Sequence, residues 1–146
     1  MAGTVKVKHV DHVGIAVKDL DAIVKLYKDL YGIEPRTREV PAMGVKGAMF
    51  DFGGGAHVEF VQPTVPDSAM AKFLETRGPG LHHIAFRVDS VQQSLDALKA
   101  KGVKLVDEKA RGGMFGTVGF AHPSSMGGIL TEFVQDFLPE HKPQQK

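Results

Sequence analysis

An internal repeat constrains the fold of this chain more than any other feature of its sequence. Residues 11–17 (DHVGIAV) resemble residues 82–88 (HHIAFRV) at an offset of 71 positions. In both segments apolar residues alternate with small or polar ones, which is typical of a β-strand with one face in a core. A repeat of this length indicates two copies of one structural unit. The chain is therefore expected to contain two similar modules.

Each of these strands is followed by a segment with helical spacing of its apolar residues. Residues 19–30 carry apolar side chains at helical intervals, and residues 90–101 do the same. Asp19 and Ser90 stand at the expected N-cap positions, where a short side-chain oxygen can accept from free backbone N–H groups. Gly32 and Gly102 follow the two segments and suit the end of a helix. The pattern predicts one helix after each repeated strand.

The two modules also end alike. Residues 57–62 (HVEFVQ) match residues 130–135 (LTEFVQ) at an offset of 73, and glycines precede both segments, as a hairpin turn would require. Each module is thus predicted to contain a strand, a helix and then two or three further strands. With three, the fold is α+β, and its two tandem βαβββ modules form a cupped mixed sheet around a metal site. We expect a single domain over residues 1–146, with module 1 at about 7–63, a linker at 64–80 containing a helix over 67–77, and module 2 at about 81–137.

The strand alternation predicts a set of four polar side chains on the face opposite the helices. His12 and His83 open the two modules, and Glu59 and Glu132 close them, and each stands out of phase with the alternating apolar residues of its strand. Pairing of the modules about a pseudo-twofold axis would let the four side chains converge. Two imidazoles and two carboxylates suit a divalent ion such as Co, Mn, Zn, Ni or Fe. A lone histidine or glutamate in a strand is usually a surface residue, but the matched pairs favour a metal site.

Composition excludes several classes of protein. With 18 Lys and Arg against 17 Asp and Glu, the net charge is +1, which does not favour a nucleic-acid partner. The absence of cysteine excludes disulfides and thiolate metal sites. No run approaches the ~18 apolar residues of a membrane span. We therefore expect a cytoplasmic protein with no membrane partner, whose polar tail after Leu138 is frayed.

Other histidines are weaker candidates for function. His57 is predicted to share the face of Glu59, two residues away, and could belong to the same pocket. His82 should point to the helix side or a strand end and pack there. His122 precedes Pro123 at the start of a loop, where it either orients a substrate or only forms a turn.

These motifs resemble those of the vicinal oxygen chelate superfamily, which includes glyoxalase I and extradiol dioxygenases. Within it the chain is most similar to the methylmalonyl-CoA epimerases, over about Val10 to Gln135. The similarity rests on residues 11–17, 67–74, 80–86 and 128–132, and on the His122-Pro123 pair. The linker and the doubled histidine after Gly80 are the segments more particular to the epimerases.

The resemblance implies a function and roles for particular residues. His12, His83 and Glu132 match the family's metal ligands, and Glu59 stands where family members carry Gln or Glu. It implies a metal-dependent epimerase that interconverts (R)- and (S)-methylmalonyl-CoA by C2 deprotonation, with Glu132 as the first candidate for a catalytic base. A small acyl-CoA substrate and a homodimer are implied as partners. Some epimerases carry a second catalytic glutamate where this chain has Gly47, so the second base is unassigned.

Three alternative functions remain within the same superfamily. A glyoxalase I-like enzyme would use a similar ligand set on a glutathione hemithioacetal. An Fe(II) dioxygenase would use two histidines and one carboxylate. A small-molecule binder would sequester its ligand without chemistry, although such binders generally lack a full ligand set.

Overall fold

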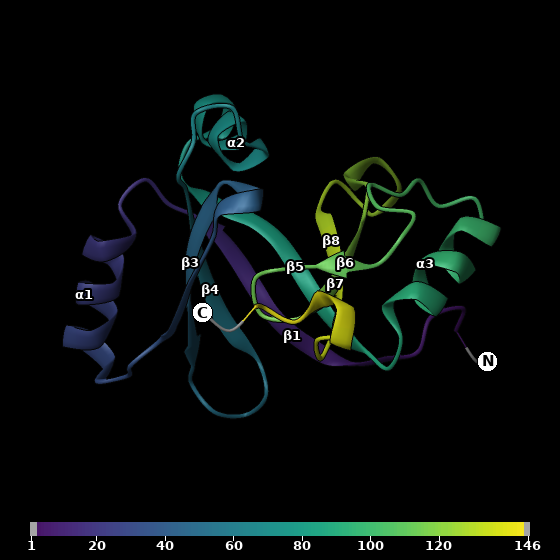
Figure 1. The fold of residues 1–146 in the computed structure, drawn as a ribbon, viewed down its shortest axis with the longest axis horizontal. Coiled ribbons are helices and arrows are strands. Elements are labelled where there is room, and N and C mark those ends of the chain that lie inside the picture. The colour runs from purple at the N-terminus through teal and green to yellow at the C-terminus, as the bar shows by residue number, and fades with distance from the viewer. Residues whose placement is uncertain (1–2, 145–146) are drawn as a thin grey trace. The chain divides into compact units, whose positions relative to one another are not determined.

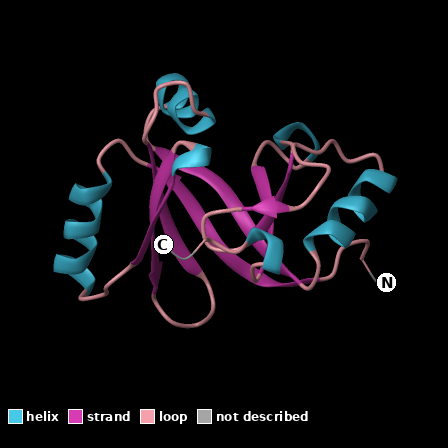
Figure 2. Ribbon diagram, viewed as in Figure 1, coloured by secondary structure: helices cyan, strands magenta, loops and turns pink. Residues whose placement is uncertain are grey.

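The computed structural model describes residues 3–144 and is α+β, with each module in the predicted βαβββ order. The first module contains β1 (Val7–Ala16), α1 (Leu20–Tyr31), β2 (Arg36–Val40), β3 (Val45–Asp51) and β4 (His57–Pro63). A linking helix, α2 (Ala69–Arg77), follows. The second contains β5 (Gly80–Val88), α3 (Val91–Ala100), β6 (Arg111–Gly112), β7 (Thr117–Ala121) and β8 (Leu130–Gln135). Short 3₁₀ turns lie at Pro41–Met43, Pro123–Ser125 and Pro139–His141 (Figures 1 and 2).

The chain divides into two compact units that share one strand arrangement. The first unit is His12–His82, and the second combines the residues up to Asp11 with those from His83 onward. In the first unit the strands are ordered β2-β3-β4-β1, and in the second β5-β8-β7-β6. The pairs β1–β4 and β5–β8 are parallel, and the other pairs within each unit are antiparallel. The repeat in the sequence is therefore a repeat in strand pairing.

In the first unit, α1 packs on one face of the strands. Its core joins Val17 and Leu20 to Phe50 and Phe60, and the partly buried Tyr27 of α1 packs against it. The Tyr27 ring lies 4.8 Å from the Phe60 ring and 5.2 Å from the Phe50 ring. Burial of these side chains holds the helix on the apolar face of β3 and β4. The helix α1 therefore covers one face of these strands and leaves the opposite face uncovered.

In the second unit, α3 packs on the strands in the same way. Val91 and Leu95 of α3 are fully buried against Ala121 and Phe133. Gly119 on β7 allows this close approach, because a Cβ there would lie 2.6 Å from Leu95 Cδ1. A larger residue at position 119 would force the Leu95 side chain to shift.

Side chains from the last strand of each unit stabilise the helix N-termini. Asp19 and Ser90 cap α1 and α3 as predicted, accepting from Ala22 N and Gln93 N. In addition, Gln62 Oε1 accepts from Leu20 N, and Gln135 Oε1 accepts from Val91 N, both at 2.8 Å. These bonds satisfy N–H groups that have no partner within the helix. The repeated glutamine thus ties each helix to its own sheet.

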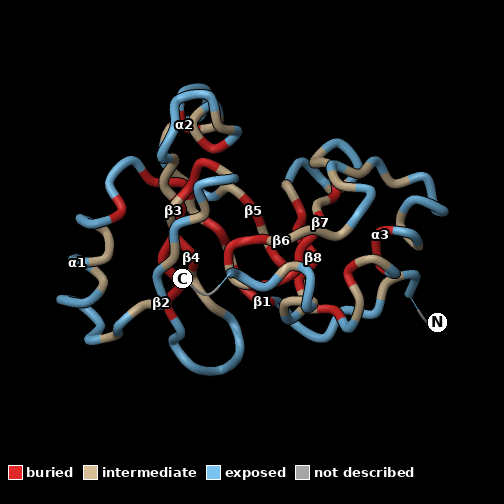
Figure 3. Tube along the Cα trace, in the orientation of Figure 1, coloured by how far each residue is buried: buried red, intermediate tan, exposed pale blue. Residues whose placement is uncertain are grey.

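The expectation of a frayed tail after Leu138 is wrong for residues 139–141, whereas residues 145–146 lie outside the described residues. Residues 139–141 form a 3₁₀ turn, and the Thr117 hydroxyl hydrogen-bonds to His141 Nδ1 at 2.9 Å. The same hydroxyl accepts from Leu138 N at 2.9 Å. Thr117 is fully buried, so these contacts hold Leu138 and His141 on β7. Figure 3 shows buried segments along β7 and β8. Among residues 3–144, no helix has the length and apolar character needed to cross a membrane.

The glutamine contacts generate a stability prediction. Gln135→Met keeps the side-chain size but removes the acceptor for Val91 N, which lies in a part-buried position. The free energy of unfolding should fall by about 1–2 kcal/mol, the cost of leaving a backbone donor unsatisfied. Urea denaturation followed by circular dichroism measures this change.

Gln93→Met is the matched control, because Gln93 is exposed on the same helix. It should change the free energy of unfolding by less than about 0.5 kcal/mol. Equal stability of the two variants would contradict the role given to the Gln135 side chain.

Candidate metal centre

A buried histidine and a buried glutamate lie together in the first unit. The β1–β4 register places Glu59 opposite Gly14, on the face away from α1. His12 and Glu59 are each only 4 % exposed. His12 Nε2 lies 3.9 Å from Glu59 Oε2, which is a close ion-pair distance but too long for a hydrogen bond.

The second unit repeats the arrangement. Glu132 lies opposite Ala85 in the β5–β8 register, as Glu59 lies opposite Gly14. His83 and Glu132 are 4 % and 6 % exposed, and His83 Nε2 lies 3.5 Å from Glu132 Oε2. A buried carboxylate is costly unless it is paired or binds a cation. Each unit therefore holds one histidine–carboxylate pair on the face that its helix leaves uncovered.

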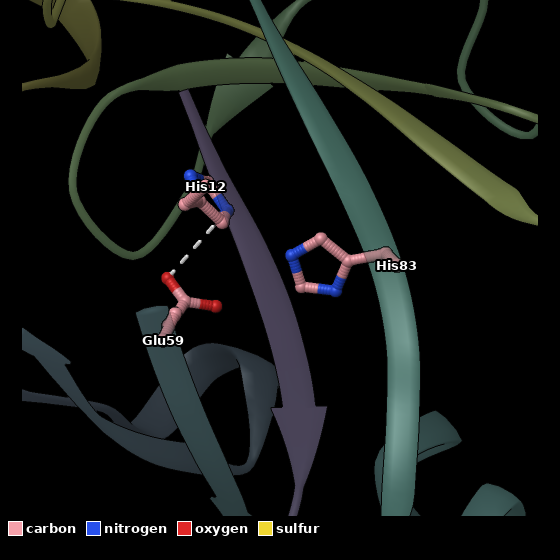
Figure 4. A group of neighbouring side chains, drawn as sticks. All are labelled: His12, Glu59 and His83. Atoms are coloured by element: carbon pink, nitrogen blue, oxygen red, sulfur yellow. Dashed lines mark ion pairs between the residues drawn. The ribbon is translucent and has the colours of Figure 1, made fainter. Parts of the chain in front are cut away.

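Three of the four side chains form a group with metal-ligand chemistry. His12, Glu59 and His83 each offer one ligand atom, and these atoms all lie within 4.8 Å of one another (Figure 4). Metal bonds of roughly 2.0–2.2 Å allow two ligand atoms of one ion to lie at most about 4.4 Å apart. Two imidazoles and a carboxylate are ligands for first-row divalent ions.

His83 contacts an aromatic ring that also carries a cation, and the sequence did not predict this arrangement. The Phe120 ring packs edge-on against the His83 imidazole at 5.8 Å, and Arg111 lies over the Phe120 ring at 5.4 Å. Phe120 faces Glu132 across the β7–β8 pair. A packed ring restrains the imidazole beside it, as a ligand site requires.

His57 lies on the same face as Glu59 and beside His12 in the strand register. Its Nε2 is 3.5 Å from Asp51 Oδ2 across the β3–β4 hairpin. The Gly53 N–H donates to Asp51 Oδ1 at 2.8 Å and lowers the pKa of Asp51, with the nearby His57 acting in the same direction. Asp51 is therefore ionised at neutral pH and can orient the His57 ring.

The other histidines have structural contacts. His82 packs edge-on against Phe73 of α2 at 4.7 Å, in agreement with the predicted packing role. His122 Nδ1 accepts from Ser124 N at 3.0 Å and forms the turn at residues 123–125. Gly47 lies on β3 opposite Arg38 and Val61, so no carboxylate stands at that position.

Comparison with known proteins identifies the family. Residues 11–121 match the model of the Glyoxalase/Bleomycin resistance protein/Dioxygenase superfamily. The chain belongs to this superfamily. The match begins within β1 and ends at β7, so it includes the first module and the second module up to β7, and it confirms the resemblance seen in the sequence.

Relatives within the superfamily are methylmalonyl-CoA epimerases. The mitochondrial enzyme of Bos taurus is 34 % identical over 86 % of this chain and 73 % of its own length. The epimerase structure from Mycobacterium tuberculosis has a TM-score of 0.85 and 36 % identity, over 96 % of this chain and 95 % of that one. A Streptomyces coelicolor epimerase in complex with 2-nitronate-propionyl-CoA has a TM-score of 0.83 and 34 % identity, over 94 % of this chain and 100 % of that one.

Proposed function

We propose that this protein is a metal-dependent epimerase that interconverts (R)- and (S)-methylmalonyl-CoA. The observation that carries the proposal is the buried histidine–glutamate pair repeated in both units. The similarity to methylmalonyl-CoA epimerases over most of the chain supports this choice of substrate. The complex of one such relative with an acyl-CoA analogue supports an acyl-CoA ligand.

His12, Glu59, His83 and Glu132 are proposed to hold one divalent ion, of which Co, Mn, Zn and Ni are the candidates. The donor set fits such an ion, because four buried side chains supply two neutral nitrogens and two anionic oxygens. The two negative charges would be compensated by the ion, which removes the penalty of burying them. When bound, the ion would supply positive charge beside the thioester and carboxylate oxygens of the substrate.

Glu132 is proposed to act as a base towards the substrate. The hydrogen at C2 lies between a thioester and a carboxylate and is acidic for a C–H group, but too weakly acidic to ionise unaided at neutral pH. A Glu132 oxygen would accept this proton, and return of a proton to the opposite face would invert the centre. Gly47 leaves the second acid or base to another group, for which His57, beside Asp51 and on the face of Glu59, is one candidate.

The small side chains that follow the two histidines are proposed to accommodate the substrate. Gly14 and Ala16 follow His12 on the same face of β1, and Ala85 follows His83 on β5. Larger residues at these positions would fill the space that a branched acyl group needs.

Deuterium exchange tests the proposed function. The purified protein with added Co²⁺ should exchange the C2 hydrogen of methylmalonyl-CoA in D₂O, followed by NMR. A glutathione hemithioacetal in a parallel assay should give no product. Turnover of the hemithioacetal without exchange at C2 would instead identify a glyoxalase I-like enzyme.

Removal of either imidazole tests the metal ligands. His12→Ala and His83→Ala should each lower the content of divalent metal, measured by elemental analysis, while the domain stays folded. Both residues lie outside the apolar cores beneath the helices, so loss of a ligand is the main expected effect. His82→Ala is the matched control and should keep its metal. Wild-type metal content in both His12→Ala and His83→Ala would contradict the assignment of these histidines as metal ligands.

Substitution of the glutamates separates binding from proton transfer. Glu132→Gln keeps an oxygen donor and the side-chain size but loses most of the basicity. It should retain part of its metal and lose at least ~10²-fold in the rate of C2 exchange. Glu59→Gln should have a milder effect. Near-normal exchange by a metal-replete Glu132→Gln variant would place the base elsewhere.

A homodimer in the cytoplasm is the remaining part of the proposal. Dimers with twofold symmetry are the commonest soluble oligomers, and edge strands such as β2 and β6 favour contacts that cover them. Light scattering at micromolar concentration should give twice the mass of the 15.8 kDa chain. A monomeric mass would contradict this prediction.

A further inference from the structure

A third pair of repeat-related side chains accompanies the histidines and glutamates. Arg38 and Arg111 lie 73 residues apart, the same offset as Glu59 and Glu132. Arg38 is on the edge strand β2 and pairs with Gly47, while Arg111 is on the edge strand β6 and pairs with Val118. Each unit therefore carries one arginine at an equivalent position.

The strand register places each arginine on the face of its unit's histidine–glutamate pair. In the second unit, Arg111 pairs with Val118, and Val118 pairs with Val134, two residues beyond Glu132 on β8. Residues paired across strands share a face, as do residues two apart along one strand. Arg38 is related to Glu59 in the same way through Gly47 and Val61.

Arg111 and His83 both contact the Phe120 ring. The Arg111 guanidinium lies 5.4 Å from the centre of the Phe120 ring, which in turn lies 5.8 Å from the His83 ring. Asp107 Oδ1 accepts from Arg111 Nε at 2.9 Å, and Asp107 Oδ2 accepts from Phe120 N at 3.0 Å. One carboxylate thus aligns both the guanidinium and the ring beneath it.

The contacts of Arg111 leave part of its guanidinium available to a ligand. Asp107 uses Nε, and the Arg111 side chain is 39 % exposed. Arg87 differs, because its Nε and Nη2 bind Asp11 and its Nη1 binds Asp136. An arginine that presents two parallel N–H donors is suited to bidentate recognition of a carboxylate or phosphate.

We propose that Arg111 binds the free carboxylate of the acyl-CoA substrate and so determines specificity for malonyl-type thioesters. This inference rests on the proposed function. The pantetheine arm separates the phosphates of coenzyme A from the thioester by many bonds, whereas the free carboxylate is one carbon from it. A cation linked to His83 through a single ring is therefore placed for the carboxylate rather than for the phosphates.

Two thioesters that differ only in the carboxylate test the assignment. Calorimetry gives the dissociation constants of malonyl-CoA and propionyl-CoA for the wild type and for Arg111→Gln, at matched metal content. Loss of a charge-assisted hydrogen bond should weaken malonyl-CoA binding by about tenfold or more. The dissociation constant of propionyl-CoA should change by less than about twofold, because this thioester lacks the carboxylate that Arg111 is proposed to bind. The dissociation constant of malonyl-CoA for Arg111→Lys should lie between those for the wild type and Arg111→Gln, because lysine keeps the positive charge but lacks the two parallel N–H donors of the guanidinium.

Arg38→Gln is the matched variant from the equivalent position and should keep the wild-type dissociation constants for both thioesters. Equal weakening of both thioesters by Arg111→Gln would overturn the assignment and indicate contact with the phosphates. No weakening, or a selective loss in Arg38→Gln instead, would also overturn it. The wild type separates failure of the Arg111 assignment from failure of the proposed function. If the proposed function is wrong, the wild type will neither exchange the C2 hydrogen of methylmalonyl-CoA nor bind malonyl-CoA more tightly than propionyl-CoA.

Discussion

Packing of one helix on one face of each unit's strands is the constraint on which the rest of the structure depends. Tyr27 of α1 against Phe60, and Leu95 of α3 in the space beside Gly119, fix which face of the strands is apolar. Because strand side chains alternate, every second residue is then directed to the other face. His12, Glu59, His83 and Glu132 all occupy such positions. The buried polar pairs are thus a consequence of the same alternation that builds the cores.

The sequence predicted the features that depend on local pattern. The βαβββ order, the caps Asp19 and Ser90, and the facing of the four polar side chains all follow from period-2 or helical spacing and from short side-chain oxygens. Features that depend on contacts between distant residues were missed. Gln62 and Gln135 were recognised as a repeat, but their bonds to the helix N-termini cross more than 40 residues. The tail was predicted wrongly because its partner, Thr117, lies 24 residues earlier.

Arg111 was missed for a different reason. Its strand, β6, has only two residues and carries no alternation that could reveal it. The only available signal was the offset of 73 from Arg38, which becomes meaningful once the strand pairs show that both residues hold equivalent positions. The two units then differ in one informative way. Glu59 faces Met49, while Glu132 faces Phe120, which carries the contacts to His83 and Arg111. This asymmetry favours Glu132 over Glu59 as the residue that acts on the substrate.

The central claim is that the two repeated pairs bind one ion together, and anomalous diffraction from crystals grown with Co²⁺ tests it most directly. We expect a single anomalous peak bonded to a nitrogen of His12 and of His83 and to an oxygen of Glu59 and of Glu132. Separate peaks at the His12–Glu59 and His83–Glu132 pairs, or a peak bonded to none of these residues, would contradict the claim.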